Sequence, residues 1–275
     1  MGDYFFLNGK IVPAREAWLR VTDLALLRGF GIFDFFRTHN GIPFLMDKYI
    51  DRFFNSSKHI DLEIPYSPET IKNAVNELLN KNKIIESGIR MVLTGGYTEN
   101  GYTPGEPNFF ILVEKINFPE QELYDKGVKL IFYEHQRELS HIKSINYLSP
   151  ISNRKITQRE NAYDVLYHSN NLVLEVSRSN FFIIKDGVII TPNKNILSGI
   201  TRASVIALAK ELYRVEEREV SLDEVLKADE AFMTGTTKKV LPVTSIDDHI
   251  YNQGKPGPVT QRLMSLFYDF EDNIQ

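Results

Sequence analysis

Hydrophobic residues follow two different periods along the chain. Alternation at every second position, typical of strands, marks the N-terminal "YFFLNGKIV", and "FDFFRTHNGIPFL" is predicted to form a second pair of strands. An Asn-Gly pair interrupts each of them, at 8–9 and at 40–41, and predicts the tight turn of a β-hairpin. In "MDKYIDRFFNSSKHI" the apolar residues instead recur every three to four positions, which predicts an amphipathic helix.

The rest of the first half continues this mixture of strands and helices. Ser67 and Pro68 are typical of a helix start, as cap and first-turn residue, and predict a helix through "IKNAVNELLNKN". The segments "IRMVLTGG" and "NFFILVEKI" predict strands on either side of a Gly-rich loop. Together these elements predict a small α+β domain over residues 1–116.

The second half is richer in strands. A polar stretch that contains Pro119, residues 117–126, is the predicted linker between two domains. Strands are predicted at "VKLIFYE", near Val165, Leu174 and Phe182, before and after a hairpin turn at Asp186-Gly187, and in "EAFMTGTTKKVLPV". Helices are predicted from about Tyr147 to Glu160, in "SGITRASVIALAKEL", and from about Gly257 to Phe270. We therefore expect residues 127–275 to form a larger domain, α+β or a mixed barrel.

Composition narrows the classes of protein that the chain could belong to. Its 275 residues, 43% of them hydrophobic, are enough for one or two domains with a sizeable core. A net charge of −4 argues against a protein that grips nucleic acid or an anionic membrane. The absence of cysteine excludes disulfides, thiolate nucleophiles and Cys-based zinc sites. The N-terminus lacks a signal-peptide pattern and no apolar run is long enough to span a membrane, so we expect a cytoplasmic protein.

Three short motifs point to chemistry that their surroundings do not support. "RGFGIFD" has Asp34 where a dinucleotide fingerprint needs its third glycine. The six histidines lack the spacing of a zinc site, so we expect no metal. Ser140 to Lys143 and Ser152 to Lys155 both match the S-x-x-K of serine acyl-transfer enzymes, but the companion motifs K-T-G and S-D-N are absent.

Lys143 lies between two isoleucines in "HIKSINYLSP". Its ordinary interpretation is a surface lysine on a strand whose isoleucines point inward. The alternative is a desolvated amine, because burial lowers the pKa of a lysine and a neutral amine can form a Schiff base with an aldehyde. That alternative requires a carbonyl on a cofactor or substrate.

Other side chains could hold such a cofactor, although each has an ordinary interpretation. Glu175, in the apolar strand "VLEVSRSNFF", could face a pyridinium nitrogen instead of water. "SGITR" opens a helix, and its N–H groups at Ile200 and Thr201 suit a phosphate or simply an ordinary cap. The "TGTT" turn adds hydroxyls, and Arg52 could bind a phosphate in a bidentate way or lie on a solvated helix face. An aldehyde, a ring nitrogen and a phosphate together describe pyridoxal 5'-phosphate.

The ordered set of motifs resembles the class IV (fold-type IV) pyridoxal-phosphate aminotransferases. This family contains branched-chain and D-amino-acid aminotransferases and aminodeoxychorismate lyase. The resemblance covers nearly the whole chain and is carried by "FFLNGKIVP", "IDRFFNS", "IKSINYL", "LEVSRSNFF", "ILSGITR" and "FMTGTTKKVLPV". It implies a small two-layer α/β N-terminal domain, a larger pseudo-barrel C-terminal domain with the cofactor between them, and a homodimer.

Carried over by position, the resemblance implies a role for each motif residue. Lys143 would be the Schiff-base lysine and proton shuttle, and Glu175 the partner of the pyridine nitrogen. Leu197 would lie against the ring, and Asn180 beside the cofactor. The phosphate would be held by Arg52, Ile200, Thr201 and Thr236.

The resemblance also implies substrate contacts. "FDFFR" resembles the "FEGIR" of branched-chain enzymes and "NYL" is shared with them, which implicates Phe33, Arg37 and Tyr147, together with Arg90 on a strand. The loop "GGYTENGYTP" has Asn100 where D-amino-acid enzymes and the lyases carry an arginine. Branched-chain enzymes have small residues and an acid in place of Thr237-Lys238-Lys239, whose lysines could contact a carboxylate or be solvated turn charges.

The expected activity is transfer of an amino group between an L-branched-chain amino acid and a 2-oxo acid. The alternatives are a lyase that releases pyruvate from an aminodeoxychorismate-like substrate and a D-amino-acid aminotransferase. A non-enzymatic α+β binding module is a further alternative, and it would take up no cofactor.

Overall fold

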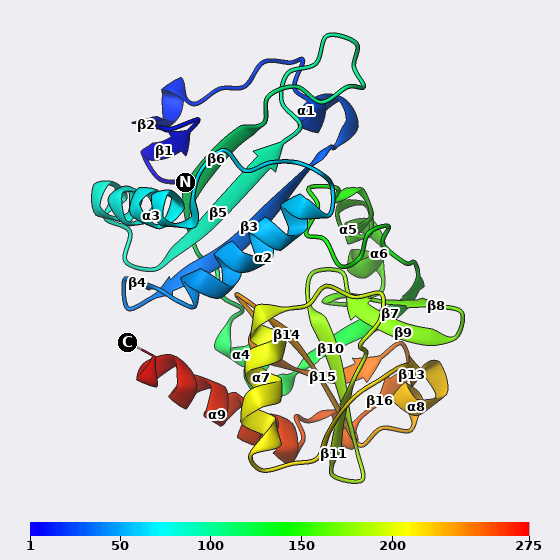
Figure 1. Ribbon diagram of the computed structural model, residues 1–275. Coiled ribbons are helices and arrows are strands. Elements are labelled where there is room, and N and C mark those ends of the chain that lie inside the picture. The colour runs from blue at the N-terminus through cyan, green and yellow to red at the C-terminus, as the bar shows by residue number, and fades with distance from the viewer. Residues whose placement is uncertain (275) are drawn as a thin grey trace. The chain divides into compact units, whose positions relative to one another are not determined.

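The computed structural model describes residues 1–274, which form two compact units (Figure 1). The first unit comprises Met1–Asn117 and the short segment Ile142–Asn146. The second comprises Phe118–His141 and the rest of the described chain from Tyr147. The domain limits predicted from the sequence, 1–116 and 127–275 with a linker at 117–126, stay a prediction.

The first unit is built on a six-stranded antiparallel sheet with the order β2-β1-β6-β5-β3-β4. Both predicted hairpins are confirmed, because Asn8, Gly9, Asn40 and Gly41 all adopt the positive φ angles that such turns require. The strands are β1 (Tyr4–Leu7), β2 (Lys10–Pro13), β3 (Gly31–His39), β4 (Ile42–Pro43), β5 (Ser87–Thr94) and β6 (Asn108–Lys115).

Two helices, α2 (Met46–Lys58) and α3 (Pro68–Asn82), cover one face of this sheet (Figure 1). The side chains under them, such as Phe36 on β3 and Phe109 on β6, are fully buried. The Ser67 hydroxyl accepts the N–H of Thr70, which confirms the predicted cap. The sequence did not predict the five-residue helix α1 (Leu24–Arg28) or the 3-10 turn Ala14–Glu16.

The opposite face of the sheet carries alternate residues of β3 and their neighbours on β5. Because successive strand residues point to opposite faces, Phe33 and Phe35 lie on this second face. The segment that carries Lys143 extends the same sheet edge. Phe33 donates its N–H to the Lys143 carbonyl at 2.9 Å, and Ile145 donates to the Gly31 carbonyl at 3.1 Å. Lys143 is therefore fixed beside Phe33 by backbone hydrogen bonds.

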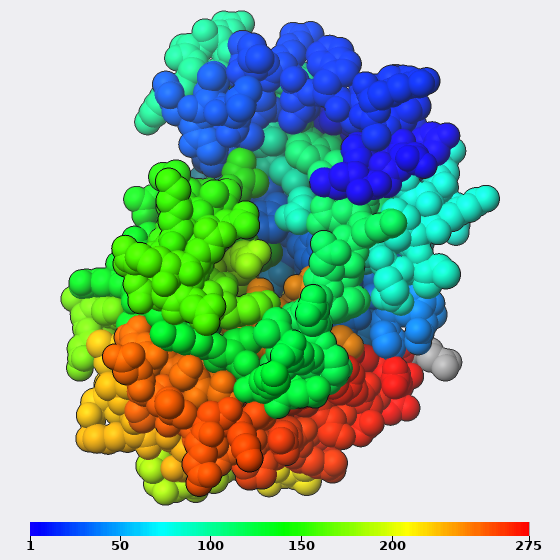
Figure 2. Space-filling view, turned by 180° about the vertical axis from the view of Figure 1, so that it is seen from behind, coloured from blue at the N-terminus to red at the C-terminus, as the bar shows by residue number. Residues whose placement is uncertain are grey.

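The second unit is built on a ten-stranded mixed sheet with the order β12-β11-β10-β14-β15-β7-β8-β9-β13, to which β16 adds at β15. In Figure 2 the green residues 118–141 lie against the orange C-terminal strands, in keeping with the parallel pairing of β7 and β15. The strands are β7 (Val128–Glu134), β8 (Asp164–Ser169), β9 (Leu172–Val176), β10 (Asn180–Lys185), β11 (Val188–Thr191), β12 (Val215–Glu217), β13 (Val220–Ser221), β14 (Glu230–Gly235), β15 (Lys239–Ile246) and β16 (His249–Ile250).

This sheet curls on itself. Strands β9 and β10 are separated by four others in the pairing order, yet a turn at residues 177–179 joins them. Val176 and Ser179 form an antiparallel bridge across that turn. A flat sheet could not bring these strands together, so the sheet must close into a partial barrel around its apolar side chains. The predicted pseudo-barrel is confirmed.

The helices of the second unit differ from the prediction in two ways. One predicted helix is divided, and short helices occur where none was predicted. The helix expected from Tyr147 to Glu160 is divided at Asn153 into α5 (Leu148–Ser152) and α6 (Arg154–Arg159). The predicted linker contains the helix α4 (Gln121–Lys126), and α8 (Leu222–Leu226) was not predicted. The predicted helices α7 (Ile200–Lys210) and α9 (Pro258–Asn273) are confirmed, and a 3-10 turn occupies Asn252–Gly254. Among residues 1–274, no helix is both long and apolar enough to cross a membrane.

Candidate active site

The first unit brings together three of the predicted site residues. The Lys143 ammonium lies 4.7 Å from the centre of the Phe33 ring, and the Arg90 guanidinium lies 5.4 Å from the same ring. Arg90 also forms an ion pair of 2.7 Å with Glu114 on the neighbouring strand. Lys143 is half-buried, and its role as the Schiff-base lysine stays a prediction. The sheet thus presents an amine, an aromatic ring and a guanidinium on one face.

Arg52 lies on α2 and is paired with Asp34. Its Nε and Nη2 donate to the two carboxylate oxygens of Asp34, at 2.9 and 2.6 Å. Its side chain is 12% exposed, so the alternative of a solvated helix face is wrong. Asp34, which stands in place of the third glycine of a dinucleotide motif, therefore orients Arg52. The contact between Arg52 and a phosphate stays a prediction.

Arg37 and Asn100, which were both predicted to contact substrate, interact with neighbouring residues of the first unit. Arg37 is 1% exposed, and its guanidinium stacks on Phe44 at 4.9 Å. The Asn100 carbonyl oxygen accepts the N–H groups of Tyr102 and Thr103, at 3.0 and 2.8 Å. Such hydrogen bonds shape the loop locally, as Asn side chains commonly do. The substrate roles of both residues stay predictions.

In the second unit, Glu175 is held as a buried carboxylate. It is 5% exposed, and its Oε1 accepts the Nε of Arg137 at 2.8 Å. Its Oε2 accepts the N–H of Leu197 at 3.0 Å. This excludes the interpretation of an edge-strand carboxylate that faces water. Sequence reasoning missed Arg137, because nothing in the polar run "HQRELS" indicates a partner 38 residues away.

The start of α7 lies beside Asn180. The Asn180 amide donates to the Leu197 carbonyl at 2.8 Å. Gly199 precedes the helix, and a Cβ there would lie only 2.0 Å from the Asn180 Oδ1, so no larger residue fits. Because glycine has no side chain to cap the helix, the first-turn N–H groups at Ile200 and Thr201 have no side-chain cap. This arrangement suits an anion.

Two buried hydroxyls next to this helix start have no partner. Among residues 1–274, Ser179 Oγ and Thr234 Oγ1 are buried without a hydrogen bond. Thr234 pairs with Asn180 across the strands, and Ser179 Oγ lies 3.2 Å from the position of a Cβ on Gly235. An unsatisfied buried hydroxyl costs free energy that a ligand can recover. With Thr236 and Thr237 half-buried in the next turn, these donors fit the phosphate of pyridoxal phosphate.

The two lysines of the turn after Thr237 are not the solvated charges that were the simpler expectation. Lys239 forms an ion pair of 2.6 Å with Glu271. Lys238 is 6% exposed, and no other residue among 1–274 forms an ion pair or hydrogen bond with its ammonium. Burial, and after it the charge of Arg178, lower the pKa of Lys238 to about 8, while the charge of Asp164 opposes the shift.

This burial predicts an unusual dependence of stability on pH. The unfolded chain keeps the Lys238 pKa near 10.5, so folding at pH 7 carries a cost of about 3 kcal/mol. The cost disappears as pH rises from about 8 to 10.5, because the unfolded amine then loses its proton too. We expect Lys238→Met to raise the free energy of unfolding at pH 7 and to lose this advantage toward pH 10.5. Urea unfolding of both proteins across this range checks it, and an equal difference at every pH would contradict it.

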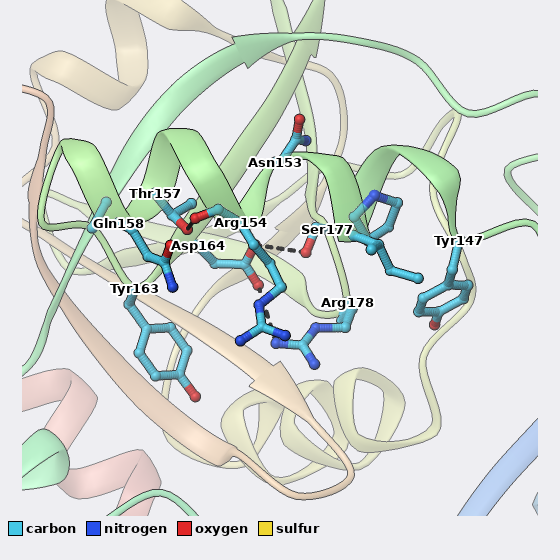
Figure 3. Close-up of a pocket in the computed structure, with 12 residues that line it drawn as sticks. Tyr147, Asn153, Arg154, Thr157, Gln158, Tyr163, Asp164, Ser177 and Arg178 are labelled. Atoms are coloured by element: carbon cyan, nitrogen blue, oxygen red, sulfur yellow. Dashed lines mark hydrogen bonds and ion pairs between the residues drawn. The ribbon is translucent and has the colours of Figure 1, made fainter.

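A cavity of about 650 Å³ borders the turn between β9 and β10 (Figure 3). Tyr147, the residue predicted to contact substrate, lies at one end of it. Ser177 and Arg178 come from the turn itself, two and three residues after Glu175. Ser177 donates its hydroxyl to Asp164 at 2.6 Å. The turn that follows the buried carboxylate thus forms a wall of a cavity large enough for a small molecule.

Comparison with known proteins agrees with the order of the motifs. The model of the family "amino-transferase class IV" matches residues 31–246. A protein of Methanocaldococcus jannaschii, provisionally named a branched-chain-amino-acid aminotransferase, is 34% identical over 277 residues, which cover 96% of this chain and 95% of that protein. The D-alanine aminotransferase of Bacillus licheniformis is 32% identical over 268 residues, with 94% and 93% covered.

Solved structures share the fold over the whole chain. The branched-chain amino acid aminotransferase of Escherichia coli superposes with a TM-score of 0.92 at 27% identity, covering 98% of this chain and 94% of that one. The branched-chain enzyme of T.th., solved with N-(5'-phosphopyridoxyl)-L-glutamate, gives a TM-score of 0.91 at 29% identity and covers 100% and 96%. The chain therefore belongs to the class IV aminotransferases.

Proposed function

We propose that the protein is a pyridoxal-phosphate-dependent transaminase that moves an amino group between an L-branched-chain amino acid and a 2-oxo acid such as 2-oxoglutarate. The observation that carries the cofactor assignment is the buried Glu175 carboxylate, fixed by Arg137 and by the Leu197 N–H. A fixed negative charge of this kind keeps a pyridinium nitrogen protonated, which the ring needs to absorb carbanion electrons.

Each proposed residue has a separate task. Pyridoxal phosphate, when bound, supplies the electron sink and carries the amino group between the two substrates. Lys143 would hold the cofactor through its Nζ, and its amine would accept and return the proton of the substrate α-carbon as general base and acid. Ile200, Thr201, Thr236 and Arg52 hold the phosphate, with Leu197 against the ring and Asn180 beside it. Phe33, Arg90 and Tyr147 contact the substrate.

The side chain and stereochemistry of the donor are the open part of the proposal. Branched-chain donors are supported by the names of the similar structures and by the aromatic Phe33 beside Lys143. D-alanine is the second candidate, because a D-alanine aminotransferase is nearly as similar at 32% identity. Asn100 weakens that candidate, since a neutral amide cannot replace the guanidinium of an arginine toward a carboxylate.

A single-turnover titration separates these donors. L-leucine, L-alanine, D-alanine and L-glutamate are added separately to the cofactor-loaded protein while its absorption spectrum is followed. Rapid conversion to the pyridoxamine form by L-leucine supports the proposal, and conversion by D-alanine alone would replace it with the second candidate. A cofactor that none of the four converts would favour the lyase that releases pyruvate.

We also propose that the protein is a homodimer that works in the cytoplasm. Trp18, Val21 and Leu26 of the first unit are 66%, 72% and 70% exposed, and large exposed apolar side chains are typical of an interface. A groove of about 280 Å³ lined by Phe5, Trp18 and Phe110 lies in the same unit. Sedimentation of the protein and of a Trp18→Asp variant checks the dimer, and a monomeric wild type at micromolar concentration would contradict it. Cell fractionation checks the location.

A further inference from the structure

The cavity beside the β9–β10 turn contains two arginines that face the same space. Arg154 reaches it from the start of α6, and Arg178 from the turn (Figure 3). The guanidinium of Arg154 has no ion pair or hydrogen bond to any other described residue. Arg178 has one partner, Asp164, whose Oδ2 lies 4.0 Å from its Nη2. Both side chains are exposed, that of Arg178 to 55%, so water screens their mutual repulsion, but together they give this space a positive charge that attracts an anion.

The Asp164 carboxylate offsets only part of this positive charge. Its Oδ1 accepts the N–H of Val165 at 2.9 Å and the Ser177 hydroxyl at 2.6 Å, and its buried Oδ2, which faces Arg178, accepts no hydrogen bond from any described residue. One carboxylate therefore stands against two guanidinium groups, and Lys238, which does not line the cavity, interacts electrostatically with both Arg178 and Asp164. The charged side chains that line the cavity therefore sum to a positive charge, although Asp164 by itself repels an anion.

The remaining walls fit a short carbon chain. Pro150, Ile151 and Ala162 are apolar, and the rings of Tyr147 and Tyr163 line the space between them. Burial raises the pKa of Tyr163, so its hydroxyl stays a hydrogen-bond donor at neutral pH. The planar fork of a guanidinium matches the two oxygens of a carboxylate. A volume of about 650 Å³ is within the usual range for a small-molecule site, roughly 300–1,000 Å³.

We propose that this cavity binds a small dicarboxylate, with Arg154 and Arg178 pairing with one of its carboxylates. Two sources share this chemistry. One is the distal carboxylate of an acidic amino acid or 2-oxo acid that the enzyme turns over, and this source rests on the proposed transaminase function. The other is a separate acid that binds without reacting.

Calorimetric titration of the cofactor-loaded protein with glutarate tests the site. Glutarate has no amino or oxo group, so its binding is independent of turnover. We expect wild-type protein to bind it and Arg154→Gln or Arg178→Gln to weaken binding at least tenfold. Arg159→Gln is the matched control, because Arg159 lies on the same helix, is 72% exposed and pairs with Glu160. Absent binding, equal affinities in all four proteins, or tighter binding of inorganic phosphate than of glutarate would overturn the proposal.

Steady-state kinetics of the same variants distinguishes the two sources. A higher KM for 2-oxoglutarate, with an unchanged KM for 4-methyl-2-oxopentanoate, assigns the site to the distal carboxylate of the substrate. Unchanged KM values for both, together with weakened glutarate binding, assign it to a separate acid. An enzyme without transaminase activity that still binds glutarate through these arginines would refute the proposed function and leave the site in place.

Discussion

Replacing Lys143 with alanine is expected to lower the transamination rate by roughly 10²- to 10⁴-fold, the usual contribution of a general acid–base catalyst. The reason is that Lys143 supplies the reacting amine. Its backbone pairs with the edge of β3, and its Nζ lies 4.7 Å from the centre of the Phe33 ring. Alanine can neither hold the cofactor aldehyde nor move the proton at the α-carbon. The spectrum of the loaded variant should be that of a cofactor without a lysine attached, and initial rates with L-leucine measure the loss.

Lys155→Ala is the control for this prediction. Lys155 is exposed on α6 and belongs to the second S-x-x-K match, so its removal should leave rate and spectrum unchanged. Full activity in Lys143→Ala, or an equal loss in Lys155→Ala, would sink the mechanism.

Replacing Glu175 with glutamine should reduce turnover by roughly 100-fold or more, a usual cost of removing one fixed electrostatic group from an active site. Cofactor retention should change much less, because the phosphate is proposed to bind at the start of α7. The neutral amide would no longer favour the protonated ring nitrogen. Single-turnover rates and the affinity for pyridoxal phosphate are to be measured on the same preparation.

The partner Arg137 makes this experiment ambiguous unless it is controlled. Its Nη2 lies 2.7 Å from Glu175 Oε1, and removal of one member of a buried ion pair destabilises a protein by leaving the other charge unpaired. The double variant Glu175→Gln, Arg137→Gln should therefore regain stability without regaining turnover. If turnover returned together with stability, or if cofactor affinity fell as much as rate, Glu175 would be a structural residue only.

The parts of the fold that the sequence predicts well are those with a local physical cause. The Asn-Gly pairs at 8–9 and 40–41 adopt positive φ because those residues tolerate it. Ser67 caps α3 because its hydroxyl reaches the Thr70 N–H three residues on. The short helices α1 and α4 were not predicted, because a helix of five or six residues shows too little hydrophobic periodicity to be recognised.

The parts of the site that sequence reasoning missed depend on residues that are distant along the chain. Nothing local indicates that Asp34 orients Arg52, 18 residues later, or that Arg137 pairs with Glu175. The burial of Lys238 was also unexpected, because a Thr-Thr-Lys-Lys turn has the composition of a solvated one. Only the folded sheet decides which of these charges are taken out of water.

Borohydride reduction of the cofactor-loaded protein, followed by peptide mass mapping, tests the central claim most directly. Reduction makes the link between cofactor and lysine permanent, so the modified peptide identifies the amine that carries the cofactor. The account predicts modification of the peptide that contains Lys143. Modification at Lys238, whose burial favours the neutral amine that an aldehyde requires, or at no lysine at all would contradict it.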